Sequence, residues 1–170
     1  MRPALTLVVC GAPLAARSAE VATALADRGW SVTTVVSPSA LQWRSAPPVA
    51  ARTPRPATVL ALPLTFNSAN KVAAGIMDTR TCGALCDALG AGVPVFAVAM
   101  VNDRLWGHPV WSSTLRALTG AGVRWLDPLD GPVDRPAAVP SGTGDELVRS
   151  FDPVAIAAAI VPGERSVQAP

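Results

Sequence analysis

Residues 63–111 read PLTFNSANKVAAGIMDTRTCGALCDALGAGVPVFAVAMVNDRLWGHPVW, and no other part of the chain places so many polar side chains after short apolar runs. One run, TVLAL at 58–62, leads into this stretch, and we expect Pro63 to end it. The other run is VPVFAVA at 93–99. Both have the length and composition of buried parallel strands. Because open α/β sheets bind ligands just beyond the carboxyl ends of such strands, the pattern predicts a ligand crevice.

Two helices are predicted between these strands. The first, KVAAGIMD at 71–78, can be capped by Asn67 or Ser68, whose side chains suit a helix start. The second, CGALCDALGAG at 82–92, ends in glycines that suit a left-handed cap. The polar residues would therefore lie where strands end and helices begin.

The rest of the chain continues this alternation. Strands are expected at 5–9, 31–36 and 123–126, and helices at 15–29, 112–120 and 152–160. The Pro-rich segment 44–57 is interpreted as a loop or extended arm, and 127–144 as a mobile Pro/Gly-rich connection. The alternation predicts the α/β class, as a three-layer Rossmann-like (flavodoxin-like) sandwich with a parallel sheet. We expect a single domain over 1–162 and a flexible tail over 163–170.

Composition excludes several classes of function. Half of the 170 residues are hydrophobic and 15% are charged, which favours apolar subunit interfaces. The net charge is +2 and the arginines are scattered, so nucleic acid binding has no electrostatic support. No apolar run is long enough to span a membrane, and the first residues lead into a strand rather than a signal peptide, so we expect a cytoplasmic protein. The three cysteines show no metal-ligand pattern, and buried thiols are expected.

Two motifs in the central stretch resemble those of the flavoprotein cysteine decarboxylases, which include phosphopantothenoylcysteine decarboxylase and the peptidyl-cysteine decarboxylases of lantibiotic and linaridin biosynthesis. The family's Pro-Ala-Ser-Ala-Asn-Thr corresponds to PLTFNS at 63–68. Its substrate clamp, Pro-x-Met-Asn-x-x-Met-Trp, corresponds to AMVNDRLW at 99–106. Asn67, Asn102 and Trp106 are retained, whereas the proline and both methionines of the clamp are replaced. The resemblance implies that 1–162 is a flavoprotein domain.

The resemblance also implies FMN as the cofactor and assigns residues to it. Ser37 and Ser39 correspond to a stretch that contacts the FMN phosphate, although they can also cap the next helix. Trp43 falls where the family has an aromatic residue near the flavin, with core packing as the alternative. Asp78 can cap a helix or orient the flavin through its neighbours. The full set of cofactor residues implied is Gly11, Ala12, Ser37, Ser39, Trp43, Thr65, Asn67, Asp78, Thr79 and Thr81.

The catalytic and substrate residues follow from the same motifs. Asn67 and Asn102 would hold the substrate carboxylate, because amides donate hydrogen bonds without a charge that would lock the carboxylate in place. Their alternatives are a helix cap and a turn residue. The family's catalytic histidine falls on Val49, so the single histidine, His108, is either a substitute base or part of the scaffold. The substrate residues implied are Met100, Asn102, Leu105 and Trp106.

These assignments lead to three hypotheses about function. The first is FMN-dependent oxidative decarboxylation of a C-terminal cysteine in a ribosomal precursor peptide, which yields an enethiol. The second is a phosphopantothenoylcysteine decarboxylase-like activity on a small thiol, but such enzymes have a late cysteine where this chain has PSGTGD at 140–145. The third is a catalytically inactive FMN-binding partner subunit. The family assembles as homotrimers, and a homododecamer of four trimers is the larger alternative.

Overall fold

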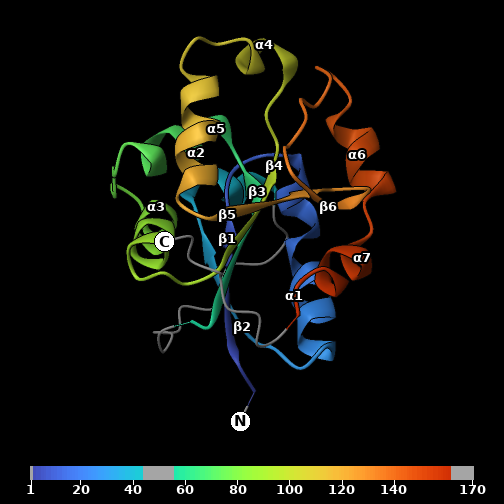
Figure 1. Cartoon of the computed structure of the whole chain (residues 1–170). Helices are drawn as coiled ribbons and strands as arrows, with labels where there is room; N and C mark the ends of the chain where they lie inside the picture. Colours follow the sequence, from blue (N-terminus) through green and yellow to red (C-terminus); the bar gives the residue numbers. More distant parts are fainter. Residues whose placement is uncertain (1, 44–55, 162–170) are drawn as a thin grey trace.

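The computed structural model describes residues 2–43 and 56–161. Within these ranges the strands form one six-stranded sheet in the order β2-β1-β3-β4-β5-β6. Neighbouring strands from β2 through β5 are parallel, and β6 pairs antiparallel with β5 (Figure 1). The α/β class and the parallel sheet predicted from the sequence are confirmed. The strands are β1 (Ala4–Val9), β2 (Ser31–Val36), β3 (Thr58–Leu64), β4 (Val95–Ala99), β5 (Val123–Asp127) and β6 (Gly131–Val133).

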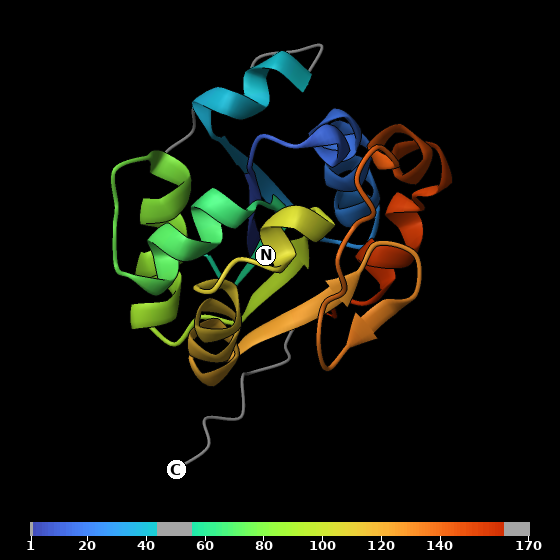
Figure 2. The ribbon, with the colours of Figure 1, turned by 90° about the horizontal axis from the view of Figure 1, so that it is seen from above.

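Helices cover both faces of the sheet, which gives the three layers seen from above in Figure 2. One face packs against η1 (Pro13–Arg17), α1 (Ser18–Asp27) and α7 (Pro153–Ala158). The other face packs against α2 (Phe66–Ala73), α3 (Arg80–Gly90) and α5 (Trp111–Gly120). The remaining helices are η2 (Pro38–Trp43), α4 (Asp103–Trp106) and α6 (Gly144–Ser150). In the described ranges, no helix is long and apolar enough to cross a membrane.

Burial on two faces explains why the central strands are apolar at nearly every position. In β1, Leu5, Leu7 and Val9 belong to the core on the α1 side, whereas Val8 belongs to the core on the α3 side. All seven residues of β3 are buried. Each fully buried aliphatic side chain stabilises the fold by about 1.5–3 kcal/mol. The strand ends are therefore held rigidly, and so are the polar residues that follow them.

The prediction that Pro63 ends its strand was wrong. The strand β3 continues to Leu64, and its register against β4 shifts between Ala61 and Leu64. Pro63 lies inside this irregularity, so the sheet does not need the N–H that proline lacks. The Pro63 carbonyl still accepts a hydrogen bond of 3.1 Å from Cys10 N, which ties β3 to the end of β1.

Residues 127–144 are more regular than the predicted mobile connection. They contain β6, and Val139 forms a bridge to Asn102 outside the main strands. The helix α6, which the sequence analysis did not predict, begins at Gly144. The predicted arm at 44–57 lies largely outside the described residues, as do Val49 and the predicted tail.

Candidate functional site

A crevice of about 710 Å³ lies beyond the carboxyl ends of β1, β3 and β4, where the sequence predicted a ligand site. Residues far apart in the chain meet in this crevice, from the loops that follow β1, β2, β3 and β4 and from the segment that leads into α6. The predicted site residues that line it are Gly11, Ala12, Ser39, Trp43, Thr65, Asn67, Met100, Asn102 and Leu105.

The loops after β1 and β2 touch each other at one end of the crevice. A Cβ atom on Gly11 would lie 2.4 Å from Ser39 Oγ, so only glycine allows this approach. Ser37 is buried and does not line the crevice, but its Oγ lies 3.1 Å from Ser39 Oγ, within hydrogen-bond distance. The Ser37 N–H donates to Val9 O at 2.9 Å. Ser39 is therefore a site-lining hydroxyl, and Ser37 positions it.

The loop after β3 places Asn67 in the first turn of α2. Thr65 caps this helix, because its Oγ1 accepts a hydrogen bond of 3.4 Å from Ser68 N. The prediction that Asn67 or Ser68 is the cap was therefore wrong. Asn67 is exposed, and within the part of the chain that the structure describes its carboxamide forms no hydrogen bond. Both its donor and its acceptor are available to a ligand.

The loop after β4 holds Asn102 differently. Asn102 is the cap of α4, and its Oδ1 accepts a hydrogen bond of 2.9 Å from Leu105 N. The carboxamide nitrogen, with two N–H donors, has no partner in the part of the chain that the structure describes, so it is left for a ligand. Asn102 is thus both a cap and a residue of the crevice wall, so the structural and the ligand-binding interpretations are compatible.

A strap formed by residues 139–141 closes the crevice beside this loop. Val139 N donates to Val101 O at 2.9 Å, and Asp103 N donates to Val139 O at 3.2 Å. The Ser141 hydroxyl donates to the Asp103 carboxylate, and this hydrogen bond lowers the pKa of Asp103. The strap therefore holds its place through backbone and side-chain contacts together.

His108 and Trp106 do not line the crevice but lie behind it. The His108 ring packs edge-on against Phe66 at 5.5 Å between centroids, and Phe66 itself lines the crevice. His108 Nδ1 accepts a hydrogen bond of 3.2 Å from Val110 N. Trp106 packs against Trp111 at 5.4 Å. These contacts favour the scaffold interpretation of His108, and Trp106 acts on the crevice only through its neighbours.

Three predicted cofactor residues lie at the start of α3, outside the crevice formed by this chain. Thr79 caps α3 by accepting a hydrogen bond of 3.2 Å from Cys82 N, so Asp78 is not the cap. Asp78 instead forms an ion pair of 2.6 Å with Lys71, which raises the pKa of Lys71. Thr81 is buried, and its Oγ1 lies 3.0 Å from Thr79 Oγ1. A cofactor role for these residues stays a prediction.

The crevice also contains residues that the site prediction missed. The segment 140–145 had been noted only for its missing cysteine, yet it forms one wall and places the Asp145 carboxylate there. No cysteine lines the crevice within the described residues. The missed residues are Pro13, Gln42, Phe66, Val139, Pro140, Ser141, Gly142, Gly144 and Asp145.

Comparisons with known proteins identify the fold. No protein-family model matches the chain, and no curated protein matches it. Solved structures do match. The FMN-binding protein AtHal3 has a TM-score of 0.67 at 18% identity, over 93% of this chain and 94% of that one. The FMN-dependent cysteine decarboxylase SpaF has a TM-score of 0.63 at 20% identity, over 93% and 98%.

A third similar structure contains a bound ligand. It is a mutant of PPC decarboxylase complexed with pantothenoylaminoethenethiol, with a TM-score of 0.64 at 18% identity, over 78% of this chain and 90% of that one. At these identities the likeness shows a shared fold across nearly the whole length of each neighbour. The class of protein that the fold defines is therefore a Rossmann-like α/β sandwich of the kind found in these flavoproteins.

Proposed function

We propose that the crevice binds FMN and that the chain oxidatively decarboxylates a C-terminal cysteine of a ribosomal precursor peptide, giving an enethiol. One observation carries this proposal. Asn67 and Asn102, the two amides retained from two separate motifs, line one crevice together with the Gly11–Ser39 loop contact. The fold shared with FMN-binding and cysteine-decarboxylating proteins supports the same assignment.

The residues of the crevice fit FMN. At the end formed by the loops after β1 and β2, Gly11, Ala12, Ser39 and Gln42 offer backbone and neutral polar groups, which suit a phosphate. The crevice also includes Asp145, which follows Gly144 beside Pro13. Trp43 adds an aromatic side chain of the kind that packs against flavin rings. The volume of about 710 Å³ is in the range of cofactor sites. When bound, FMN would supply a two-electron acceptor for oxidation of the substrate thiol.

The chain's own residues would then bind and orient the substrate carboxylate. Among the described residues, Asn67 has no partner for its carboxamide, whereas the cap bond of Asn102 fixes its oxygen and leaves its nitrogen as the donor. Both side chains are neutral. They can therefore orient the carboxylate by hydrogen bonds without the strong charge pairing that would stabilise the ground state over the transition state. Met100 and residues 139–141 line the crevice together with these two asparagines.

The small-thiol activity remains as the second enzyme hypothesis. The resemblance implies that enzymes which reduce the enethiol use a cysteine from a late Cys-Gly-Asp-x-Gly stretch. Here the corresponding wall is formed by Pro140, Ser141 and Gly142. This difference favours an enzyme that stops at the enethiol. The inactive-subunit hypothesis rests on Val49, which lies outside the described residues, and on the position of His108 behind Phe66.

The proposal is tested by two measurements on the purified protein. Added FMN should be retained through gel filtration with flavin absorbance, and light scattering should report a homotrimer or homododecamer. Mass spectrometry of a Cys-terminated peptide should show a loss of about 46 Da, which is carbon dioxide plus the two hydrogens transferred to the cofactor. The same peptide ending in serine is the control and should not change.

Each result separates the hypotheses. A protein that retains no FMN contradicts the flavoprotein assignment. A protein that retains FMN but leaves Cys-terminated peptides and phosphopantothenoylcysteine unchanged is the inactive subunit. A protein that acts on phosphopantothenoylcysteine and not on peptides supports the small-thiol activity.

A further inference from the structure

Oxidation of a cysteine thiol releases a proton as well as an electron pair, and the proton needs an acceptor in the crevice. In the family that the motifs resemble, the catalytic histidine falls on Val49 of this chain, and valine has no basic group. The two asparagines of the crevice are neutral amides and do not accept a proton near neutral pH. The acceptor has to be another residue of the crevice.

Asp145 is the one ionisable side chain among the described residues that line the crevice. The others are glycine, proline, aliphatic and aromatic residues, together with alcohols, amides and the Met100 thioether. A carboxylate is one of the groups that proteins use as a general base. Asp145 is therefore the candidate acceptor that the described lining offers.

The packing of α6 fixes Asp145 at the crevice wall. A Cβ atom on the preceding Gly144 would lie 3.0 Å from Pro13 Cγ, so the start of α6 lies tightly against the loop after β1. Further along the helix, Arg17 Nη1 donates a hydrogen bond of 2.5 Å to Val148 O. These contacts hold the helix from two sides, and the Asp145 backbone is held with it.

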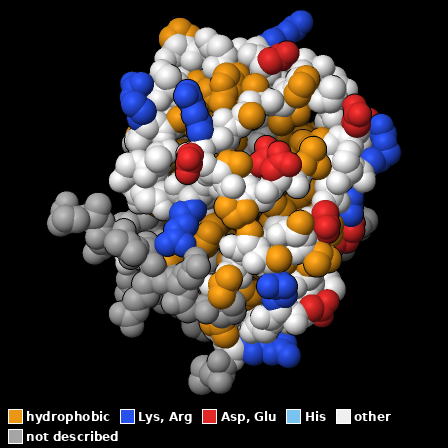
Figure 3. Space-filling model, turned by 45° about the vertical axis from the view of Figure 1, so that its right-hand side comes forward, with side chains coloured by type: hydrophobic (Ala, Val, Ile, Leu, Met, Phe, Trp, Pro, Cys, Tyr) orange, Lys and Arg blue, Asp and Glu red, His pale blue; other side chains and the backbone are white. Residues whose placement is uncertain are grey.

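The Asp145 carboxylate is available to a substrate. It is exposed, and within the described ranges it forms neither an ion pair nor a hydrogen bond. In the view of Figure 3, acidic side chains lie among hydrophobic ones near the centre of the face. Asp103 differs, because its carboxylate accepts hydrogen bonds from the Ser141 hydroxyl and from Arg104 N, and it does not line the crevice.

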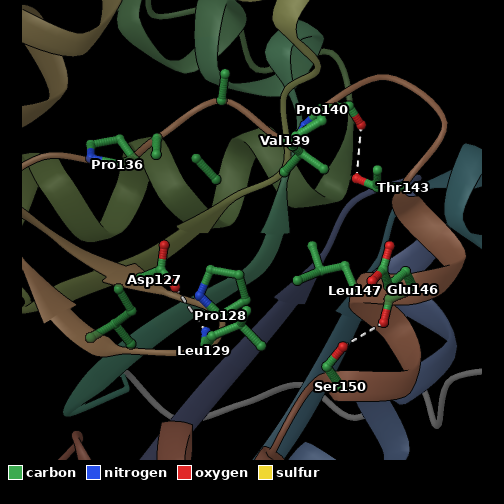
Figure 4. Close-up of a pocket in the computed structure, with 14 residues that line it drawn as sticks. Asp127, Pro128, Leu129, Pro136, Val139, Pro140, Thr143, Glu146, Leu147 and Ser150 are labelled. Atoms are coloured by element: carbon green, nitrogen blue, oxygen red, sulfur yellow. Dashed lines mark hydrogen bonds between the residues drawn. The ribbon is translucent and has the colours of Figure 1, made fainter.

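The two other nearby candidates face away from the crevice. His108 lies behind Phe66, and its Nδ1 already accepts a hydrogen bond from Val110 N. Glu146 lines a separate hollow of about 330 Å³, where Figure 4 shows it beside Leu147 on α6. Neighbouring carboxylates on one helix therefore face different hollows, which provides a matched control.

We propose that Asp145 is the general base that accepts the thiol proton when the substrate cysteine is oxidised. The inference rests on the proposed function, because it assumes that the cysteine and the oxidised flavin occupy the crevice. The S–H bond breaks and its proton goes to the Asp145 carboxylate. A hydrogen of the adjacent carbon leaves with its electron pair to the flavin, and a carbon–sulfur double bond forms. The cysteine is thus oxidised by two electrons and the flavin is reduced by two.

The same carboxylate can return the proton in the second step. The bond between the α-carbon and the carboxylate carbon breaks, and carbon dioxide leaves. The electron pair of that bond forms the carbon–carbon double bond of the enethiol, and the sulfur takes the proton back from Asp145. A carboxylate is a weak base toward a resting thiol, but the thiol proton becomes more acidic as the hydride leaves the neighbouring carbon. General bases of this kind contribute about 10²–10⁴-fold to a rate.

The test follows the oxidation step alone. FMN-loaded protein is mixed without oxygen with a Cys-terminated peptide, and the loss of flavin absorbance gives the rate of oxidation. Asp145→Asn keeps the size of the side chain and removes the base, so this rate should fall by about 100-fold or more. Asp145→Glu restores a carboxylate and should recover part of the rate. Glu146→Gln makes the same change of charge outside the crevice and should react at the wild-type rate.

Two further readouts separate a base from a residue that only binds or supports. Fluorescence anisotropy with a labelled peptide that ends in serine should give the same dissociation constant for Asp145→Asn as for the wild type, and the melting temperature should not change. The wild-type oxidation rate should fall as the pH is lowered, because a protonated carboxylate cannot accept the proton. This decrease should persist in Glu146→Gln and be absent from the residual rate of Asp145→Asn.

Other results would overturn the proposal. If Asp145→Asn oxidised the peptide as fast as the wild type, another group would be the base. A faster variant would show that Asp145 repels the substrate, and equal losses of peptide binding in Asp145→Asn and Asp145→Glu would show a structural role. A wild-type protein that neither reduces its flavin nor modifies the peptide removes the proposed function and the base together. Full activity of the wild type and of Asp145→Asn removes the base alone.

Discussion

Two loops supply asparagines to the crevice, and they hold them in different ways. After β3, Thr65 caps α2, and the Asn67 carboxamide has no hydrogen-bond partner in the described ranges. After β4, Asn102 itself caps α4 and contributes only its nitrogen to the crevice. The sequence presents both as an asparagine after a buried strand. The difference teaches that the Asn67 side chain can be changed without loss of a helix cap, whereas a change at Asn102 keeps the cap only if the new side chain retains the accepting oxygen.

The largest effect is expected from Asn67→Asp. The variant would place an anion beside the substrate carboxylate, and repulsion at about 4 Å in a partly desolvated crevice amounts to several kcal/mol. Turnover measured by mass spectrometry should fall by orders of magnitude, whereas FMN retention and the oligomer should not change.

Ala74→Asp is the matched control for this change. Ala74 is exposed and follows the last residue of the same helix, so the variant adds the same charge outside the crevice. Its turnover should stay near that of the wild type. If Asn67→Asp turned over substrate as fast as the wild type, Asn67 would not contact the reacting carboxylate. The difference between the two loops would then have no effect on function.

The comparison also shows what the sequence could and could not predict. The strand at Ser31–Val36 has the predicted bounds, and the crevice lies where the polar residues after the strands placed it. Apolar runs and strand-end polarity are local signals, so they survive in a single sequence. Which residue caps a helix depends on a shift of one or two positions, and the choice of Thr65 over Asn67 could not be read from residue type, since both are good caps.

The strap and α6 were missed for a different reason. The segment 134–143 is rich in proline and glycine and has no apolar periodicity, so locally it predicts a loop. Its order comes from contacts distant in sequence, such as the hydrogen bonds of Val139 to Val101 and Asp103. Leu147 attaches α6 to the core through partial burial. Tertiary contacts of this kind leave no pattern in the segment itself.

Asn102 gives the second prediction, in which stability and turnover separate. Asn102→Ala removes the cap of α4 and should cost about 1 kcal/mol, which lowers the melting temperature by about 2–4 °C for a chain of this size. Asn102→Asp keeps an oxygen that can accept from Leu105 N but loses the donor nitrogen. It should keep the stability and lose turnover, and calorimetry with the peptide assay measures both.

Asp152→Ala controls for cap loss elsewhere. Asp152 caps α7 by accepting a hydrogen bond of 2.8 Å from Val154 N, and it does not line the crevice. This variant should lose a similar amount of stability and no turnover. If Asn102→Asp instead retained full turnover, Asn102 would be a cap alone and the proposed carboxylate contact would be wrong.

His108 provides a third and smaller effect, because it links the two loops through its contact with Phe66. If it only shapes the crevice, His108→Ala should reduce turnover modestly, and His108→Phe should restore it by replacing the ring. If it is a substitute base, both variants should lose as much turnover as Asn67→Asp, and the pH profile of the residual activity should change. The pH dependence of turnover in the two variants decides between these roles.

The smallest effect is expected from Ser141→Ala, which weakens the strap beside the second loop only. The Ser141 hydroxyl is the main cause that lowers the pKa of Asp103 in the folded protein. A lowered folded-state pKa stabilises the protein above the unfolded-state pKa, and this contribution is lost as the pH falls through the folded-state value. The variant should therefore melt slightly below the wild type near neutral pH, and this difference in melting temperature should disappear in acid as Asp103 becomes protonated.

Ser113→Ala is the control. It removes an exposed hydrogen bond of 2.7 Å to the Val110 carbonyl, where no carboxylate takes part, so its difference in melting temperature from the wild type should not depend on pH. A gap for Ser141→Ala that stays constant across this range would show that Asp103 does not hold the strap, and the second loop would then depend on the Val139 backbone alone.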